Sequence, residues 1–179
     1  MDTDLIERVR QRGGGCAPFS LAGKVLPGVV VSVYDGDTMT VTLPVVDDIY
    51  RFSVRIAGID TPEIKSKAAD LRAKAIRSRN RVLQLVGMNI GLDDVLSKKD
   101  IETMLEKVRP LVEVRCMDWD KYGRLMAEIR PLEYDRSTGA VRGPSIAEVL
   151  IQEKLAYAYT GDTKLTEAEQ SEVIVGVRA

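Results

Sequence analysis

The sequence contains no histidine and only two cysteines, and these scarcities exclude several kinds of chemistry. Without histidine there is no Ser-His-Asp triad, no imidazole general base and no histidine-ligated metal. Cys16 and Cys116 are too few for a disulfide scaffold, they lack the spacing of a zinc site, and we do not expect them to pair. Acid–base chemistry in this chain must therefore come from carboxylates, lysine or tyrosine.

Long apolar runs are also missing. No run approaches the ~18 residues that a membrane-spanning helix needs, and residues 1–15 are charged and lack the apolar centre of a signal peptide. The 179 residues are 45% hydrophobic and 30% charged, which is ordinary for one globular domain. We expect an intracellular, monomeric protein with no membrane partner.

Net charge is nearly absent, but the charges are unevenly distributed. A formal net charge of −1 argues against a protein that coats nucleic acid without specificity. Lysine and arginine dominate residues 65–81, where Asp70 is the only acid, whereas acidic residues dominate residues 93–106. The basic segment either steers a phosphate backbone or forms a solvated helix face, and the sequence leaves both readings open.

The first half of the chain reads as an extension followed by three strands. Residues 1–23 form the extension, with a short helix over 4–12 and a flexible break at 13–15. Alternating and β-branched residues predict strands at 24–34, 38–43 and 49–56, joined by turns at 35–37 and 44–48. These three strands form a meander.

The second half reads as helices around another hairpin. Apolar periodicity predicts helices over 67–86, ending at Gly87, and within 89–110 after a Ser97 cap. Further expected elements are strands at 111–117 and 124–130, a helix from a Ser145 capping box to about residue 153, a short strand at 156–159, and a last helix with a Thr166 capping box.

This order of elements predicts an α+β fold. Five strands, arranged as a meander and a hairpin with a helix between the third and fourth strands, match a five-stranded OB-fold barrel with flanking helices. The main domain is expected at residues 24–162, with an inserted segment at about 87–110, and residues 163–179 form a C-terminal helix or tail.

The stretch from residue 55 to residue 63 concentrates the reactive groups. Alternation along the third strand places Arg55 on the face opposite the core residues. Asp60 follows at the strand end, and Pro62 is expected at the first position of a helix, with Glu63 near its positive end. A simple helix start is the alternative interpretation of this stretch.

Two carboxylates and two arginines suggest metal-assisted phosphodiester cleavage. Asp37 and Asp60 both lie at strand ends and supply hard oxygen ligands of the kind that Ca²⁺ or Mg²⁺ prefers. Arg55 and Arg124 suit the negative charge that develops on a phosphate in the transition state. Considered singly, the 35–37 motif fits a plain turn, and Arg124 fits a surface residue beside a turn.

Four motifs in order resemble the staphylococcal nuclease (thermonuclease-like) family. They are VYDGDT at 33–38, RIAGIDTPE at 55–63, DKYGR at 120–124 and LAYAY at 155–159. Spaced motifs that agree in order are far more specific than any one motif. The resemblance covers roughly residues 24–159 with one insertion.

The resemblance implies a Ca²⁺-dependent nuclease. Asp37 and Asp60 would supply carboxylate oxygens to the ion, and Thr61 its backbone carbonyl. Glu63 would hold or deprotonate the attacking water. The substrate would be DNA or RNA, preferably single-stranded, and cleavage would leave a 3′-phosphate and a 5′-hydroxyl.

The same resemblance implies how the phosphates are bound. Arg55 and Arg124 would clamp the scissile phosphate and stabilise the five-coordinate transition state. Lys121 and Tyr122 would contact a neighbouring phosphate.

The chain departs from the family pattern in two places. Lys154 stands where the family commonly has glycine, and the connection over 87–110 is longer than usual. The acidic helix of this connection binds a protein partner, shades the cleft or is surface decoration. Tyr157 or Tyr159 either stacks on a base or fills the core.

Two other functions remain as alternatives. Some family members keep the fold without the catalytic residues, so a noncatalytic OB-fold module that binds nucleic acid through residues 65–81 is one of them. The other is a Mg²⁺ nuclease that uses Asp60 with Glu63 and Lys65. We disfavour it because Glu63 and Lys65 should share a strand in such a site, whereas Pro62 is expected to start a helix.

Overall fold

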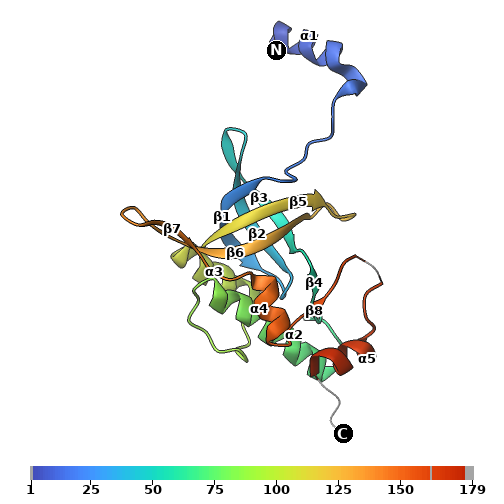
Figure 1. Cartoon of the computed structure of the whole chain (residues 1–179), viewed down its shortest axis with the longest axis vertical. Coiled ribbons are helices and arrows are strands. Elements are labelled where there is room, and N and C mark those ends of the chain that lie inside the picture. Colours follow the sequence, from blue (N-terminus) through green and yellow to red (C-terminus); the bar gives the residue numbers. More distant parts are fainter. Residues whose placement is uncertain (1, 162, 176–179) are drawn as a thin grey trace.

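The computed structural model describes residues 2–161 and 163–175, and its strands form a closed ring (Figure 1). The main sheet contains β1 (Val25–Val33), β2 (Thr38–Val45), β3 (Asp48–Ile56), β5 (Leu111–Trp119), β6 (Leu125–Asp135) and β7 (Gly139–Arg142). Neighbours in the order β3-β2-β1-β5-β6-β7 are antiparallel, and a parallel pairing of β3 with β6 closes the ring. The protein is therefore α+β with a mostly antiparallel, closed sheet, which confirms the fold class at this level.

The remaining elements lie around this ring. A second, two-stranded sheet pairs β4 (Ile59–Asp60) with β8 (Tyr157–Ala158). The helices are α1 (Thr3–Arg12), α2 (Ala69–Leu85), α3 (Lys98–Val108), α4 (Ile146–Gln152) and α5 (Glu167–Gln170), with a 3₁₀ turn η1 (Gly13–Gly15) and a π turn η2 (Ser171–Val175). None of the helices in the described part of the chain combines the length and the apolar character that spanning a bilayer requires.

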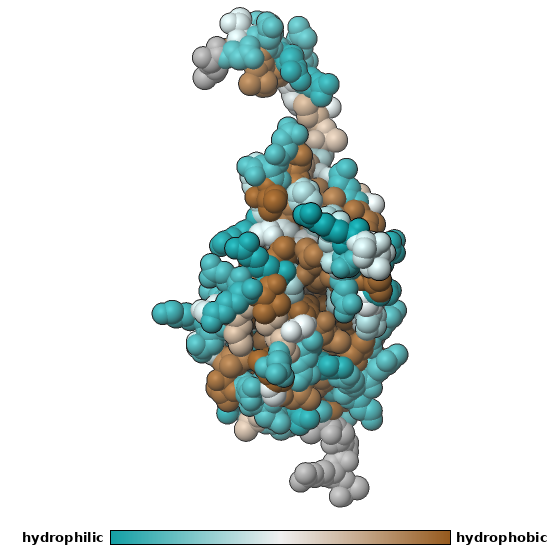
Figure 2. All heavy atoms as spheres, turned by 90° about the vertical axis from the view of Figure 1, so that its left-hand side faces the viewer, coloured by the Kyte–Doolittle hydropathy of each residue, from teal (hydrophilic) through white to brown (hydrophobic). Residues whose placement is uncertain are grey.

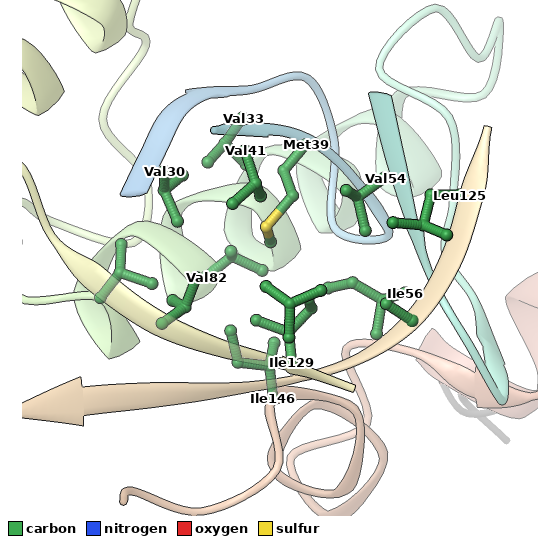
Figure 3. Packing of buried hydrophobic residues seen from close by; sticks show 14 of the residues in the cluster. Val30, Val33, Met39, Val41, Val54, Ile56, Val82, Leu125, Ile129 and Ile146 are labelled. Carbon is green, nitrogen blue, oxygen red and sulfur yellow. The ribbon is translucent and has the colours of Figure 1, made fainter. Parts of the chain in front are cut away.

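The core fills the inside of the ring (Figure 3). Residues of β1, β2, β3 and β6 that point inward include Val30, Val41, Val54 and Ile129, and these side chains are fully buried. Val82 from α2 and Ile146 from α4 pack against the same cluster. Burial of these β-branched residues on the inner face explains why the strand pattern was readable from the sequence.

The first helix stands apart from this body. None of the residues in α1 is buried, and both views show it projecting beyond the sheet (Figures 1 and 2). Leu5, Ile6 and Val9 remain largely exposed, and they form an apolar patch among charged residues. This arrangement agrees with the prediction of a helical extension before residue 24.

The segment 61–65 is not helical, which corrects the prediction that Pro62 starts a helix. The chain leaves β4 in an extended course, makes a turn in which the Ser66 amide donates to the Glu63 carbonyl, and enters α2 only at Ala69. The pairing of Asp60 with Tyr157 continues the strand just before Pro62 and so opposes helix formation there.

Two further predictions were wrong at element ends. Pro44 belongs to β2 rather than to a turn, and proline is tolerated there because β1 pairs with β2 only as far as Thr42. Ser145 is the N-cap of α4, but its side chain makes no capping hydrogen bond. By contrast, Ser97 and Thr166 form full capping boxes, with Asp100 and Glu169 respectively.

The predicted second hairpin is longer than expected. The β6 strand continues to Asp135 and turns back as β7, which the sequence reading missed. The predicted boundary at Asp162 and the last four residues of the predicted C-terminal tail, 176–179, lie outside the described residues.

Lys154 ends α4 in the left-handed conformation that favours glycine, with φ of 54°. The Leu155 amide donates to the Leu150 carbonyl and the Lys154 amide to the Ile151 carbonyl, which is the Schellman pattern. A residue with a Cβ is strained in this backbone conformation. The positive charge of Lys154 also acts on Lys74, whose pKa is lowered by burial and by the charges of Arg77 and Lys154.

We expect Lys154→Gly to stabilise the protein by about 1 kcal/mol, because glycine adopts this conformation without strain. Denaturant unfolding measures the change. Lys154→Ala is the matched control, since it removes the same charge but keeps a Cβ in the left-handed conformation. Equal stability of the two variants would show that backbone strain contributes nothing at this position.

Candidate functional site

Segments that are far apart in the sequence meet around one cavity of about 290 Å³. The β1–β2 turn, the end of β3, the segment after β4, the β5–β6 turn and the loop before α5 all line it. Predicted site residues in its wall are Asp37, Arg55, Thr61, Glu63 and Arg124. The structure therefore brings together five residues that sequence reasoning had grouped.

Arg55 links the two predicted metal carboxylates. Its Nη1 donates to Asp37 Oδ2 at 2.7 Å, and its Nη2 donates to Asp60 Oδ1 at 2.7 Å and to the Ile59 carbonyl at 3.2 Å. Arg55, Asp37 and Asp60 are only 6%, 3% and 1% exposed. Both carboxylates thus lie within hydrogen-bond reach of a single buried guanidinium group.

The short β4–β8 sheet holds Asp60 in place. Gly58, with φ of 82°, breaks the chain away from β3, and Ile59 and Asp60 then pair with β8. The Tyr157 hydroxyl donates to Asp60 Oδ2. Tyr157 is 6% exposed, so it takes the second of its two predicted roles, as a core residue that also positions Asp60.

The β1–β2 turn is fitted tightly against the segment after β4. A Cβ on Gly36 would lie 1.9 Å from Ser78 Oγ and 2.8 Å from Thr61 Cγ2, so only glycine fits. The Ile56 amide donates to the Asp37 carbonyl at 2.8 Å, which ties the turn to β3. These contacts fix Asp37 beside Arg55.

The β5–β6 turn presents Arg124 to the cavity. Asp120 accepts hydrogen bonds from the backbone amides of Tyr122 and Arg124 and binds the Arg124 side chain through Nε and Nη2 at 2.7 Å. The remaining Nη1 of Arg124 lies 3.4 Å from the Thr38 hydroxyl. Arg124 is therefore held by one edge, and its other edge faces the cavity.

The predicted substrate-binding residues line a neighbouring hollow of about 440 Å³. Lys121, Tyr122 and Tyr159 lie there, and the two arginines of the site also line it. The Arg55 guanidinium lies 5.7 Å from the Tyr159 ring centre and that of Arg124 lies 5.5 Å from the Tyr122 ring centre. Tyr122 is 73% exposed, and Lys121 Nζ also lies 5.2 Å from its ring centre, so this ring groups the two cations at the edge of the hollow.

Burial shifts the acid–base behaviour of the site. Desolvation raises the pKa of Asp37 to about 7, with a further contribution from the negative charge of Asp35, against the effect of Arg55. Burial would also raise the pKa of Asp60, but hydrogen bonds from Lys164, Tyr157 and Arg55 outweigh it and lower that pKa. The two carboxylates thus differ in how well their charge is compensated.

The donor chemistry of this cluster fits a hard cation, although its oxygens are engaged. Within residues 2–161 and 163–175, no group of three or more histidine, cysteine, aspartate or glutamate side chains is placed to hold a metal. Two carboxylates nevertheless converge on one guanidinium, and Lys164 Nζ binds Asp60 Oδ1 at 2.8 Å. Carboxylates are oxygen donors of the kind that Ca²⁺ takes, but in this structure positive side chains bind both of them.

Several residues of the site were not anticipated. Lys164 and Tyr34 line the cavity, Thr38 donates to Asp37, and Asp120 orients Arg124. Asp120 and Thr38 flank motif residues and could have been found by following the turns. Lys164 gives no local sequence signal, because only the tertiary fold brings it to Asp60.

The structure also bears on two alternatives. Glu63 and Lys65 lie in the irregular segment rather than on one strand, which removes the arrangement that a Mg²⁺ site of that type needs. In the basic segment 65–81, Arg79 is buried against Asn80 and the Leu96 carbonyl, and Arg81 pairs with Glu153. Part of that segment therefore has structural roles and is not available to phosphate.

Comparison with known proteins adds no assignment, since no protein-family model and no curated protein matches the sequence.

We expect Asp37 to titrate near pH 7, as its pKa of about 7 requires. A folded-state pKa above the usual 3.8 means that the folded protein binds the extra proton, so the contribution of Asp37 to stability falls as the pH rises from about 4 to about 7. Carboxyl-carbon NMR measures the midpoint directly.

The variant Asp35→Asn provides the control, because it removes the neighbouring negative charge. It should lower the Asp37 midpoint, whereas Asp135→Asn, at the exposed end of β6, should leave it unchanged. A wild-type midpoint near the ordinary aspartate value would contradict the burial argument.

Proposed function

We propose that this protein is a calcium-dependent nuclease that hydrolyses phosphodiester bonds of DNA or RNA, preferably single-stranded, and leaves 3′-phosphate and 5′-hydroxyl ends. The observation that carries the proposal is the convergence of Asp37, Arg55, Thr61, Glu63 and Arg124 on one cavity, with Asp60 bound to Arg55. We further propose that the closed ring is an OB-fold barrel, since its strand order has the meander, hairpin and intervening helix of that fold.

The calcium ion would be held by Asp37, Asp60 and the backbone carbonyl of Thr61. When bound, it would supply positive charge next to the phosphate oxygens. Lys164 must then leave Asp60 Oδ1, and its half-exposed side chain, at 48%, can move without disturbing the core. Arg55 keeps both carboxylates oriented throughout.

Arg124 is placed to bind the scissile phosphate. Its Nε and Nη2 are fixed by Asp120, so little side-chain freedom is lost when Nη1 binds a phosphate oxygen. This preorganised charge stabilises the transition state, in which the equatorial oxygens gain negative charge.

Glu63 is the carboxylate of the cavity wall that is exposed to solvent. It would hold the attacking water or take a proton from it. The water oxygen bonds to phosphorus, the bond from phosphorus to the 5′ oxygen breaks, and that oxygen leaves as a hydroxyl after taking up a proton. One water molecule is consumed for each bond that is cleaved.

A second candidate, a noncatalytic module that binds nucleic acid, is favoured by one specific observation. Both oxygens of Asp60 already accept hydrogen bonds, from Arg55, Lys164 and Tyr157, so its charge is satisfied without a metal. Such a module would bind single strands in a salt-sensitive manner without cleaving them.

We expect Arg124→Ala to lower turnover on single-stranded DNA by about 10²-fold or more, because it removes a charge that stabilises the transition state. Arg124 is the better probe, since loss of Arg55 would leave buried Asp37 without its ion pair, would remove one of the two cations on Asp60, and would destabilise the fold. The measurement is digestion of a labelled single strand in millimolar calcium.

The matched control is Arg136→Ala on the exposed β6–β7 turn, which should cleave like the wild type. Chelation of calcium should abolish cleavage, and end-group analysis should find 5′-hydroxyl products. Binding without any cleavage in calcium would favour the noncatalytic module. Magnesium-dependent cleavage that leaves 5′-phosphates would favour the Mg²⁺ nuclease that uses Asp60, Glu63 and Lys65.

A further inference from the structure

A groove continues from the candidate site along the outside of the sheet. A hollow of about 460 Å³ shares Tyr34, Thr38 and Ile64 with the site cavity. A third hollow, of about 610 Å³, shares Ser32, Thr40 and Lys98 with the second. We name the second and third hollows together the α3 groove, because α3 forms one of their walls.

The other wall is a regular row of polar side chains on β2 and β3. Thr38 pairs with Arg55, Thr40 with Ser53, and Thr42 with Arg51. Alternate residues of a strand share a face and are about 6.6 Å apart, so these three pairs form three steps on the outer face of the sheet. The first step is in the candidate site, and each later step lies farther along the groove.

This repeat suits an extended polynucleotide. Its step resembles the separation of successive phosphates in an extended single strand. Thr40, Ser53 and Arg51 offer donors to phosphate. The hydroxyls of Thr38 and Thr42 already donate to Asp37 and to the Val29 carbonyl. Arg51 stands at the far end of the row, whereas Arg55 at the near end is bound to Asp37 and Asp60.

Charges of both signs line the far hollow, and the α3 side carries two of its three cations as well as its two acids. Arg51, Lys98 and Arg109 contribute positive charge. Two carboxylates, Glu102 and Glu106, belong to α3, and Glu102 lies 3.6 Å from Lys98. Phosphates are therefore favoured beside Arg51 on β3, the cation that lies on the wall opposite these two acids.

The apolar lining of the far part gives the bases a place to lie. Val29, Val31 and Leu105 line this hollow beside the charged residues. A strand whose phosphates follow β2 and β3 would turn its bases toward these side chains and α3. This arrangement excludes a paired duplex, because the bases must be unpaired to lie against the protein.

We propose that the α3 groove binds the single-stranded polynucleotide on one side of the scissile bond, so that long strands bind better than dinucleotides. This inference rests on the proposed nuclease function for its placement next to the site. It assigns a binding role to the 87–110 segment, which sequence analysis had left as a partner site or as decoration.

The test is equilibrium binding of labelled oligothymidylate of about 15 nucleotides, the upper range for one OB fold, in chelator so that no cleavage occurs. The double variant Arg51→Ala/Lys98→Ala should make the slope of log K against log salt shallower by about 1.4, since each single-strand phosphate contact contributes about 0.7. Glu106→Gln should strengthen binding, because it removes a carboxylate from the groove.

Arg136→Ala is the matched control, since it removes an exposed arginine that does not line the groove and should leave the slope unchanged. Oligouridylate serves as a second probe and distinguishes an RNA from a DNA preference. An unchanged slope in the double variant, or a wild type that does not bind either probe, overturns the groove proposal.

Cleavage separates this proposal from the nuclease proposal. If wild-type protein cleaves, the double variant should reduce the advantage of the long substrate over a dinucleotide in kcat/KM by roughly tenfold. A wild type that binds with the expected slope but never cleaves supports the groove and overturns the nuclease. Cleavage by the wild type, together with an unaltered length preference in the double variant, supports the nuclease and overturns the groove.

Discussion

The buried ion cluster around Arg55 is the interaction on which the arrangement of the site depends. Two carboxylates 3% and 1% exposed repel each other, and each would be costly to bury alone. One guanidinium binds both at 2.7 Å, and Lys164 adds a second positive charge on Asp60. The turn that carries Asp37 and the short strand that carries Asp60 are thereby held to the same side chain, so neither can shift without breaking a buried ion pair.

Closure of the ring and assembly of the site are one structural event. The parallel pairing joins Val54 to Leu125 and Arg55 to Met126, directly beside both candidate arginines. Because Arg124 immediately precedes the first paired residue of β6, closing the ring brings its guanidinium to the cavity that Arg55 enters from β3. A sheet that opened at this pairing would lose the cavity even if every other strand stayed in register. The fold therefore constrains the chemistry through three residue pairs.

The sequence predicted what depends on local periodicity and failed where tertiary contacts decide. Alternation in β2 and β3 placed Arg55 on the correct face, and the capping boxes at Ser97 and Thr166 set two helix starts. The prediction that Pro62 starts a helix was wrong. Proline favours a first helical turn, but the pairing of Asp60 with β8, two residues earlier, keeps the chain extended. Lys164 could not be predicted at all, since it lies in the loop before α5 and meets Asp60 only through the folded path of the chain.

The α3 segment shows why an insertion in sequence need not be an accessory in structure. Its Ile101 and Leu105 are 1% exposed and join the main core, so this helix contributes to folding as well as to the surface. The same helix covers one side of β1 and β2 and converts an open sheet face into a groove. A loop without this packing would leave the row of threonine, serine and arginine side chains on β2 and β3 flat and fully hydrated, where isolated surface charges contribute little. Burial of one helix face therefore determines whether the polar row outside the candidate site can confine a ligand.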